Sequence, residues 1–300
     1  MTQGYEGSSR TMIAHAPGQL RIIMSDFWSA GDKGRSKQPI PGMGDARHRC
    51  ALQSFMLAEN AHMPTHFISE DKEGGFIVEE FAVPTHEPLS GTTAGEVLNG
   101  EWIWRLKNDG SLADAIERGE IDPVTLGYPA GYIPDRGDPL PRMHLKCWTK
   151  FERIDRPLED EEARDLMQLS MAEWDEAWEL VNGVVRVTVA HAKRCGYDEF
   201  DGKCELARRW NQKLSRRLLM ADTFGTQDEN RIKSLRTGEL FCKDLIRNYL
   251  KEIGWWALLK AAQKEFPDDP SKWPEYPELP PELVALVSDR YTIFADDYCS

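Results

Sequence analysis

No apolar run in the sequence approaches the roughly 18 residues that a membrane-spanning helix needs, so no membrane partner is expected. The opening residues, MTQGYEGSSR, also lack the apolar stretch of a secretory signal peptide, and a cytoplasmic location is therefore expected. Basic residues are in deficit, because 37 Lys and Arg face 50 Asp and Glu and leave a formal net charge of -13. Binding to a nucleic-acid backbone needs a basic surface, so no nucleic-acid partner is expected. A local basic pocket for a small phosphorylated molecule is compatible with this charge.

Paired cysteine motifs are also missing. The six cysteines are scattered without a Cys-x-x-Cys pair or a matching histidine spacing: Cys50, Cys147, Cys195, Cys204, Cys242 and Cys299. This spacing argues against a disulfide framework or a zinc site and predicts reduced thiols. What is present, 41% hydrophobic and 29% charged residues over a 300-residue chain, is typical of a globular protein with a full core.

The pattern of apolar residues predicts an α+β fold, with a small β-rich N-terminal lobe and a larger mixed α/β lobe. Short apolar runs bounded by Gly, Pro, Asp and Ser predict strands at 10–15, 20–25, 65–70 and 74–83, with a helix over 45–62 against them. Later elements are predicted as strands at 101–106, 201–207 and 216–222 and as helices over 159–196, 240–266 and 279–298. The polar stretch 84–100 is either a loop or the junction between the lobes, and a cleft is expected between them.

Two polar segments of the small lobe are suited to bind an anion. In YEGSSRTMI, Gly7 precedes Ser8 and Ser9, and such a hairpin can lay backbone N–H groups over phosphates with Arg10 as charge partner. The alternative is a plain β-turn. Residues 25–44, SDFWSAGDKGRSKQPIPGMG, gather both charge signs among glycines and prolines, and the alternative for this segment is a solvated loop.

Two segments of the large lobe carry clustered charge. Arg105 leaves a predicted strand and is followed by Gly110 and Ser111, which form either an anion cradle or an exposed turn. In DGKCELA, Asp201, Lys203 and Glu205 alternate, so on a strand they share one face. Charged groups on one face are costly to bury unless they hold a metal, a phosphate or each other. Asp222, at the end of the next predicted strand, would approach Glu205 across a hairpin, a geometry suited to Mg²⁺ on nucleotide phosphates; a solvent-facing charged strand is the alternative.

In this order the segments resemble the motifs of the SAICAR synthetase (phosphoribosylaminoimidazole-succinocarboxamide synthase) family. YEGSSRTMI is similar to Tyr-x-Gly-Lys-x-Lys, and 25–44 to Ser-Asp-x-x-Ser-Ala-x-Asp followed by Ile-Pro-Gly-x-Gly. MPTHFI, EWIWRLKNDGSL and WTKFERID are similar to Ile-Pro-Thr-His-Phe, Glu-x-Val-Val-Arg…Gly-Ser and Ser-Thr-Lys-x-Glu…Asp. DGKCELA and DTFGTQDENR resemble Asp-x-Lys-x-Glu-Phe-Gly and Asp-Glu-x-x-Thr-Pro-Asp-Ser-Ser-Arg. The resemblance is collinear over nearly the whole chain.

This resemblance implies an ATP- and Mg²⁺-dependent carbon–nitrogen ligase of purine biosynthesis. Such an enzyme joins the carboxylate of carboxyaminoimidazole ribonucleotide to the amine of L-aspartate through an acyl phosphate and releases SAICAR, ADP and phosphate. It implies a nucleotide-binding lobe over 1–90, a lobe with the metal and substrate site over 91–300, and an ATP-grasp-like cleft. The partners would be small molecules, and a homo-oligomer is left open.

The resemblance also implies roles for individual residues. Catalytic roles would fall to Asp201, Lys203 and Arg105, and magnesium binding to Glu205 and Asp222. The nucleotide would be bound by Gly7, Ser8, Ser9, Arg10 and Lys203. The ribonucleotide and aspartate would be bound by Ser29, Asp32, Arg35, Arg105, Ser111, Lys150, Asp155, Arg231, Lys243 and Arg247, with Lys33 and Lys37 as further candidate cations.

Some positions depart from the family pattern. Ser8 stands where the hairpin usually carries its first lysine, and the Asp-Glu pair reads Asp222-Thr223. The loop 84–100 inserts about fifteen residues, a length at which loops are usually functional or disordered. Such departures are typical of a divergent homologue. A viral homologue, which would act in the host cytoplasm, is one such case. Two alternatives to the purine-pathway ligase remain. One is a ligase of the same fold that acts on another nucleotide carboxylate or amine, and the other is a non-catalytic nucleotide-binding relative.

Overall fold

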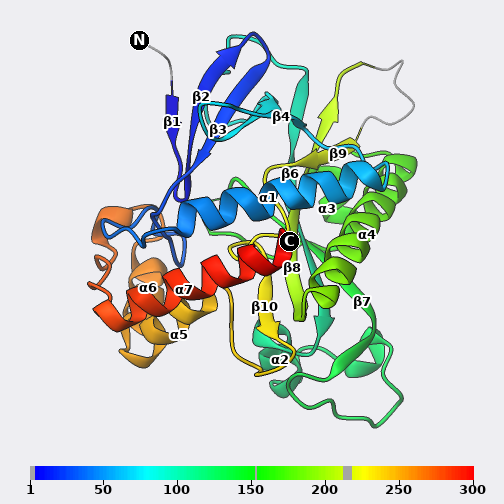
Figure 1. Cartoon of the computed structure of the whole chain (residues 1–300). Coiled ribbons are helices and arrows are strands. Elements are labelled where there is room, and N and C mark those ends of the chain that lie inside the picture. The colour runs from blue at the N-terminus through cyan, green and yellow to red at the C-terminus, as the bar shows by residue number, and fades with distance from the viewer. Residues whose placement is uncertain (1–3, 153, 212–217) are drawn as a thin grey trace.

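Two antiparallel sheets organise the chain, and Figure 1 shows them with the helices around them. The structure is a computed structural model that describes residues 4–152, 154–211 and 218–300. The first sheet has the order β1-β2-β3-β5-β4. Its strands are β1 (Gly4–Glu6), β2 (Arg10–Ala16), β3 (Gln19–Met24), β4 (Phe67–Glu70) and β5 (Phe76–Glu79). Helix α1 (Met43–Asn60) packs on β3, as the sequence predicts.

The second sheet is built around two long paired strands, β6 and β8. Its order is β10-β8-β6-β7, and β9 pairs with β8 beside this path. The bounds are β6 (Gly95–Lys107), β7 (Pro139–Trp148), β8 (Tyr197–Arg209), β9 (Leu218–Ala221) and β10 (Arg231–Ser234). Each neighbouring pair is antiparallel, so β8 runs between β6, β9 and β10 and can bring residues from all of them together.

The predicted helices 159–196 and 240–266 are each two helices, which corrects both predictions. The first divides into α3 (Asp160–Leu166) and α4 (Met171–Arg194), because Gln168 takes a positive φ of 53° and Ser170 caps α4 in a capping box with Glu173. The second divides into α5 (Asp244–Glu252) and α6 (Trp255–Glu265) at Gly254, whose φ of 79° favours glycine. The remaining helices are α2 (Gly110–Glu117), α7 (Pro281–Tyr298) and the short 3₁₀ turns Pro123–Leu126 and Pro270–Lys272.

The stretch 84–100, predicted as a loop or as the junction between the lobes, ends in a strand. Residues 95–100 belong to β6, where Gly95 pairs with Arg209 of β8. The preceding turn is held by the buried carboxylate of Glu80, which accepts hydrogen bonds from Leu89 N at 2.6 Å and Ser90 N at 2.9 Å. The other predicted strands are present, although the first two residues of the predicted strand 216–222 lie outside the described residues.

The two largest apolar cores among the described residues hold most of the elements together. One joins the two sheets to α1 and α4 and includes Phe55, Phe76 and Trp102, all with 0% exposure. The other lies among α1, α5, α6 and α7, and Figure 1 shows α7 running beside α1. No helix in the described part of the chain is long and apolar enough to span a membrane. The α+β class is confirmed, and the lobe boundary at residue 90 stays a prediction.

Candidate active site

Strands β6 and β8 present charged side chains on a common face. Because side chains alternate along a strand, Asp201, Lys203 and Glu205 of β8 point to one side, as predicted. The register sets Arg105 of β6 opposite Asp201 and Glu101 of β6 opposite Glu205. The face therefore carries two neighbouring clusters, one around Lys203 and one around Asp201.

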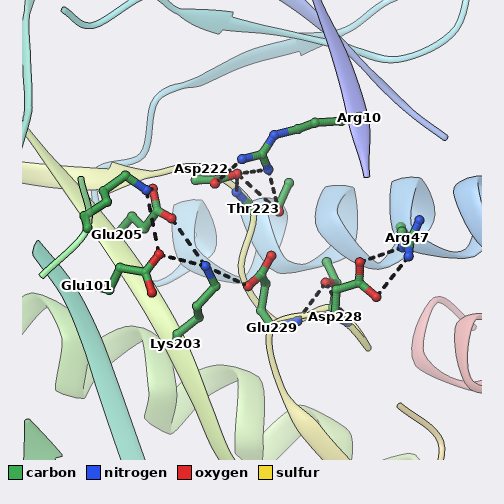
Figure 2. A network of polar contacts seen from close by, with 11 residues as sticks. Arg10, Arg47, Glu101, Lys203, Glu205, Asp222, Thr223, Asp228 and Glu229 are labelled. Carbon is green, nitrogen blue, oxygen red and sulfur yellow. Dashed lines mark hydrogen bonds and ion pairs between the residues drawn. The ribbon is translucent and has the colours of Figure 1, made fainter. Parts of the chain in front are cut away.

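Lys203 lies at the centre of the first cluster (Figure 2). Its Nζ lies 3.0 Å from Glu101 Oε1, 3.5 Å from Glu205 Oε1 and 3.5 Å from Glu229 Oε2. Burial alone would lower the pKa of Lys203, but these carboxylates, Glu229 first among them, raise that pKa well above its usual value. The ammonium is therefore firmly protonated and surrounded by anionic oxygens.

Arg10, at the start of β2, reaches this cluster from the first sheet. Its guanidinium forms a forked ion pair with Asp222 and lies 3.3 Å from Thr223 Oγ1. Burial by itself would raise the pKa of Asp222, but Arg10 and then Lys150 outweigh it and hold that pKa well below its usual range. Asp222 has a positive φ of 58°, which turns the chain out of β9 and toward Arg10.

Glu205 lies beside Asp222, as predicted, because Glu205 pairs with Ala221 across β8 and β9. Its second oxygen forms an ion pair with Lys150, whose Nζ also lies 3.9 Å from Glu101. Burial raises the pKa of Glu205 to about 6; Lys150 opposes this rise and the negative charge of Asp222 adds to it. Each of the two predicted metal ligands is therefore paired with its own cation.

These two carboxylates fit a magnesium ion bound together with nucleotide phosphates. Both side chains are buried, with 7% and 11% exposure, and both offer the hard oxygen ligands that Mg²⁺ prefers. The like charges of Glu205 and Asp222 at close quarters are the kind of crowding that a divalent cation relieves. Among the described residues, no group of three or more His, Cys, Asp or Glu side chains is placed to hold a metal ion.

Asp201 lies between two guanidinium groups in the second cluster. Arg105 donates to Asp201 Oδ2 at 3.3 Å and to Ser111 Oγ at 3.0 Å, and Arg231 Nη2 lies 2.5 Å from the same Oδ2. Burial raises the pKa of Asp201 in spite of both arginines, and burial lowers the pKa of Arg105. Two planar cations on one buried carboxylate form a fork that can take a phosphate or a substrate carboxylate.

Gly110, at the start of α2, makes room for this fork. Its φ is 56°, which favours glycine, and a Cβ there would lie 2.3 Å from Arg231 Nη1, so a larger residue would displace the Arg231 guanidinium. Asp109 caps α2 by accepting from Gly110 N at 2.7 Å, which fixes Ser111 in the first helical turn beside Arg105. The Gly-Ser sequence is therefore part of the cluster rather than an exposed turn.

The start of α5 adds the predicted cations Lys243 and Arg247. Arg247 lies 3.3 Å from Asp244, which in turn lies 3.7 Å from Arg231. Lys243 donates no side-chain hydrogen bond to any residue that the structure describes; burial and then Arg247 lower its pKa. Lys243 therefore remains available to an anionic ligand.

The hairpin 7–10 forms as predicted, with β1 paired to β2 and Gly7 N donating to Arg10 O at 2.9 Å. Ser8 and Ser9 lie in its turn, and Ser9 O accepts from Ser25 N at 2.9 Å. Arg35 donates to the carbonyls of Gly7 at 2.8 Å and Arg10 at 3.0 Å. In this arrangement Arg35 braces the hairpin through these two hydrogen bonds.

The other cations of 25–44 hold the C-terminal segment. Lys33 donates to the carbonyls of Pro270 and Trp273 at 3.1 and 3.2 Å, and exposed Lys37 lies 3.1 Å from Glu275. A cavity of about 430 Å³ lies between residues 33–39 and 275–278, outside the Lys203 cluster. The structure therefore places Lys33 and Lys37 with Arg35 at this cavity, whose lining includes no member of the Lys203 or Asp201 cluster.

Asp155 lies within electrostatic reach of Glu101 and Asp32. Burial raises the pKa of Asp155 to about 7, and the charges of Glu101 and Asp32 add to the rise. Asp155 Oδ1 is buried with no hydrogen-bond partner among the described residues. Ser29 is half-buried in the same segment as Asp32. Asp155 therefore offers an unsatisfied acceptor beside the charged face.

Two members of the first cluster were missed by the sequence reasoning. Glu101 stands in a recognised motif, and its position opposite Glu205 gives it a role that only strand register reveals. Glu229 lies in the loop before β10, within DTFGTQDENR, at a position where the family motif has serine, so the motif gave it no role. Its neighbour Asp228 turns away, to Arg47 Nε at 2.9 Å and Tyr291 Oη at 2.8 Å, and anchors α1 and α7.

Comparison with known proteins shows which family this chain belongs to. The family model described as SAICAR synthetase matches residues 3–261. The chain belongs to the SAICAR synthetase family. Phosphoribosylaminoimidazole-succinocarboxamide synthase of Thermoplasma volcanium is 30% identical over 258 residues, which is 84% of this chain and 83% of that protein. The counterpart of Thermoplasma acidophilum is 28% identical over the same shares.

Solved SAICAR synthetase structures share the fold. A SAICAR synthetase in complex with ADP matches with a TM-score of 0.64 at 22% identity, over 81% of this chain and 89% of that one. SAICAR synthase from Saccharomyces cerevisiae, complexed with SAICAR, matches with a TM-score of 0.72 at 14% identity, over 98% and 93%. The predicted family and fold class are therefore confirmed, and the ligase class follows from the family.

Proposed function

We propose that this chain joins the carboxylate of carboxyaminoimidazole ribonucleotide to the amine of L-aspartate, using ATP and Mg²⁺. The observation that carries the proposal is the pair of clusters on one face of β8. One gathers cations and acidic metal ligands suited to nucleotide phosphates, and the other holds two arginines suited to a substrate anion. Phosphoryl transfer to a carboxylate needs both kinds of site side by side.

On the nucleotide side, Arg10 and Lys203 would bind phosphate oxygens, with the hairpin Gly7–Ser9 above them. Glu205 and Asp222 would hold Mg²⁺, which when bound screens the phosphate charges and makes the γ-phosphorus a better electrophile. In the structure Arg10 and Lys150 pair with these carboxylates and compensate their buried charges, and a bound Mg²⁺ would take over that role. Lys150 and Arg10 are then free to contact phosphate.

On the substrate side, Arg105, Arg231 and Ser111 would bind the ribonucleotide phosphate, and Lys243 and Arg247 the remaining anionic groups. Asp201 holds both guanidinium groups in the orientation that their targets require. The substrate carboxylate oxygen would attack the γ-phosphorus of ATP, with release of ADP, and form an acyl phosphate. The aspartate nitrogen would then attack the acyl carbon and expel phosphate.

The attacking amine must lose a proton. Asp155 is suited to accept it, because its pKa of about 7 lies close to working pH and its buried Oδ1 lacks a partner among the described residues. Asp32 would help to hold the cationic form of the incoming amine, and Ser29 would line the same pocket. We assign Arg35 to the support of the hairpin above this site.

A coupled ADP-release assay with carboxyaminoimidazole ribonucleotide and a panel of amino acids tests the proposal. We expect ADP release that needs both the ribonucleotide and aspartate, and loss of that release in Glu205→Ala with the fold retained by circular dichroism. ADP release with a different amine or nucleotide carboxylate would instead favour a same-fold ligase of changed specificity. Absence of Mg·ATP binding in calorimetry would leave only a non-catalytic relative.

A further inference from the structure

Glu229 is the one carboxylate of the first cluster, among the described residues, to which neither the family motif nor the proposed metal site gives a role. It lies in the loop between β9 and β10, and its backbone N–H donates to Thr226 O at 3.2 Å in the turn. Its side chain is 11% exposed, and its Oε2 is buried without a hydrogen-bond partner among the described residues, 3.5 Å from Lys203 Nζ. A buried carboxylate is costly unless its charge is compensated, and the ammonium of Lys203 lies close enough to do so.

The neighbouring carboxylate shows that this orientation is specific. Asp228 points to Arg47 and Tyr291 and so serves the packing of α1 against α7. Glu229, the next residue, points the other way, into the cluster of Lys203 (Figure 2). Adjacent acidic residues of one loop therefore serve two separate networks.

The ammonium of Lys203 needs carboxylate partners other than Glu205 when a metal is bound. In the structure its ammonium is shared by Glu101, Glu205 and Glu229. Glu205 is a proposed magnesium ligand, so a bound metal competes with Lys203 for its oxygens. Glu101 from β6 and Glu229 from the loop then remain to hold the ammonium between them.

We propose that Glu229 is a positioning residue that, with Glu101, holds Lys203 toward the nucleotide phosphates while Glu205 binds the metal. This inference rests on the proposed function. It assigns a role to a residue that the family motif does not include, because the motif has serine at the position of Glu229. The glutamate of the motif stands instead at the position that Thr223 occupies in this chain. Glu229 acts on the nucleotide only through Lys203, so its effect must persist when magnesium is absent and vanish when Lys203 is replaced.

Calorimetric titration with ADP, with Mg²⁺ and in EDTA, tests this on the full chain. We expect Glu229→Gln to weaken ADP binding about 10- to 100-fold with Mg²⁺, the usual cost of removing a supporting partner. In EDTA the loss should be smaller but still measurable, because Glu205 is then free to hold Lys203 as well. Glu229→Asp, which keeps the charge at shorter reach, should recover part of the affinity. In a Lys203→Met background, Glu229→Gln should cause no further loss. Exposed Glu239→Gln, the same chemical change at a surface ion pair with Arg290, should bind as wild type.

Each other result overturns the inference. Wild-type affinity in Glu229→Gln removes the role altogether, and a loss seen only with Mg²⁺ makes Glu229 a metal ligand instead. Equal losses with and without Lys203 make its effect structural. Steady-state kinetics give a second measurement. Loss of the partner that positions a phosphate-binding lysine should raise KM for ATP more than it lowers kcat. Failure of wild type to bind ADP at all would reject the proposed function itself, which is a separate outcome.

Discussion

Arg10 and Asp222 are 212 residues apart in the sequence and form one forked ion pair. Arg10 starts β2 of the first sheet, and Asp222 directly follows β9 of the second. The contact thus joins the hairpin 7–10 to the proposed metal site. It also answers how a hairpin with Ser8 in place of a lysine still carries a cation to this site, because Arg10 supplies one.

Replacing Arg10 tests this contact. We expect Arg10→Met to raise KM for ATP by about tenfold or more, because a charged hydrogen bond to phosphate is lost and Asp222 is left without its main partner. Arg10→Lys should keep part of the affinity, since it retains charge without the fork. Steady-state kinetics with varied ATP give the answer. Arg21→Met, on the neighbouring strand and paired with exposed Glu73, is the control; an equal effect there would contradict the assignment.

The second cluster predicts a different kinetic signature. Arg231→Lys and Arg105→Lys keep the charge but remove the fork that Asp201 and Ser111 orient. We expect KM for the ribonucleotide to rise roughly tenfold or more in each, with KM for ATP nearly unchanged. Initial rates with each substrate varied in turn separate the two effects. A rise in KM for ATP alone would place these arginines on the nucleotide instead.

Glu199 on β8 predicts a pH dependence of stability. The side chain is 1% exposed, and burial raises its pKa from 4.5 to about 8, with Asp198 adding to the rise and the Asn230 amide opposing it. The folded state therefore binds this proton more tightly than the unfolded state, and the associated stability is lost as pH rises from about 4.5 through 8, by roughly 5 kcal/mol at most. Glu199→Gln cannot lose a proton there, so the variant should be more stable than wild type at pH 9 but not at pH 5. Urea unfolding at both values measures this; parallel pH profiles would contradict it.

The carboxylate of Glu80 anchors the loop before β6, and replacing it should destabilise the fold. Its two oxygens accept from Leu89 N and Ser90 N, and the side chain is 2% exposed. Glu80→Gln replaces one acceptor by a donor that faces a backbone N–H, so we expect a loss of about 1–3 kcal/mol in the free energy of unfolding. The adjacent Glu79→Gln, which affects a partly exposed ion pair with Arg209, should cost no more than about 1 kcal/mol. Chemical denaturation of both variants measures the difference, and equal costs would rule out the special role of Glu80.

Local patterns located most of the elements but missed α2, β7 and β10, and they did not give the ends of the helices. Period-2 runs located the strands of the first sheet, and apolar periodicity located the helices. The breaks at Gln168 and at Gly254 were missed because the apolar stripe continues through both, while the left-handed backbone that interrupts each helix depends on how its two halves pack. No local pattern indicated that Glu80 accepts two backbone hydrogen bonds and anchors the loop.

The sequence by itself determined which charged residues of β8 share a face, because alternation along a strand follows from covalent geometry. It also determined that Glu205 and Asp222 meet, since a hairpin pairs neighbouring strands. Only the tertiary structure decided that Arg10 reaches Asp222, that Arg35 braces the hairpin and that Glu101 and Glu229 surround Lys203. Those contacts join segments far apart in the chain. Strand order, register and helix packing set their positions, and no local pattern of residues encodes them.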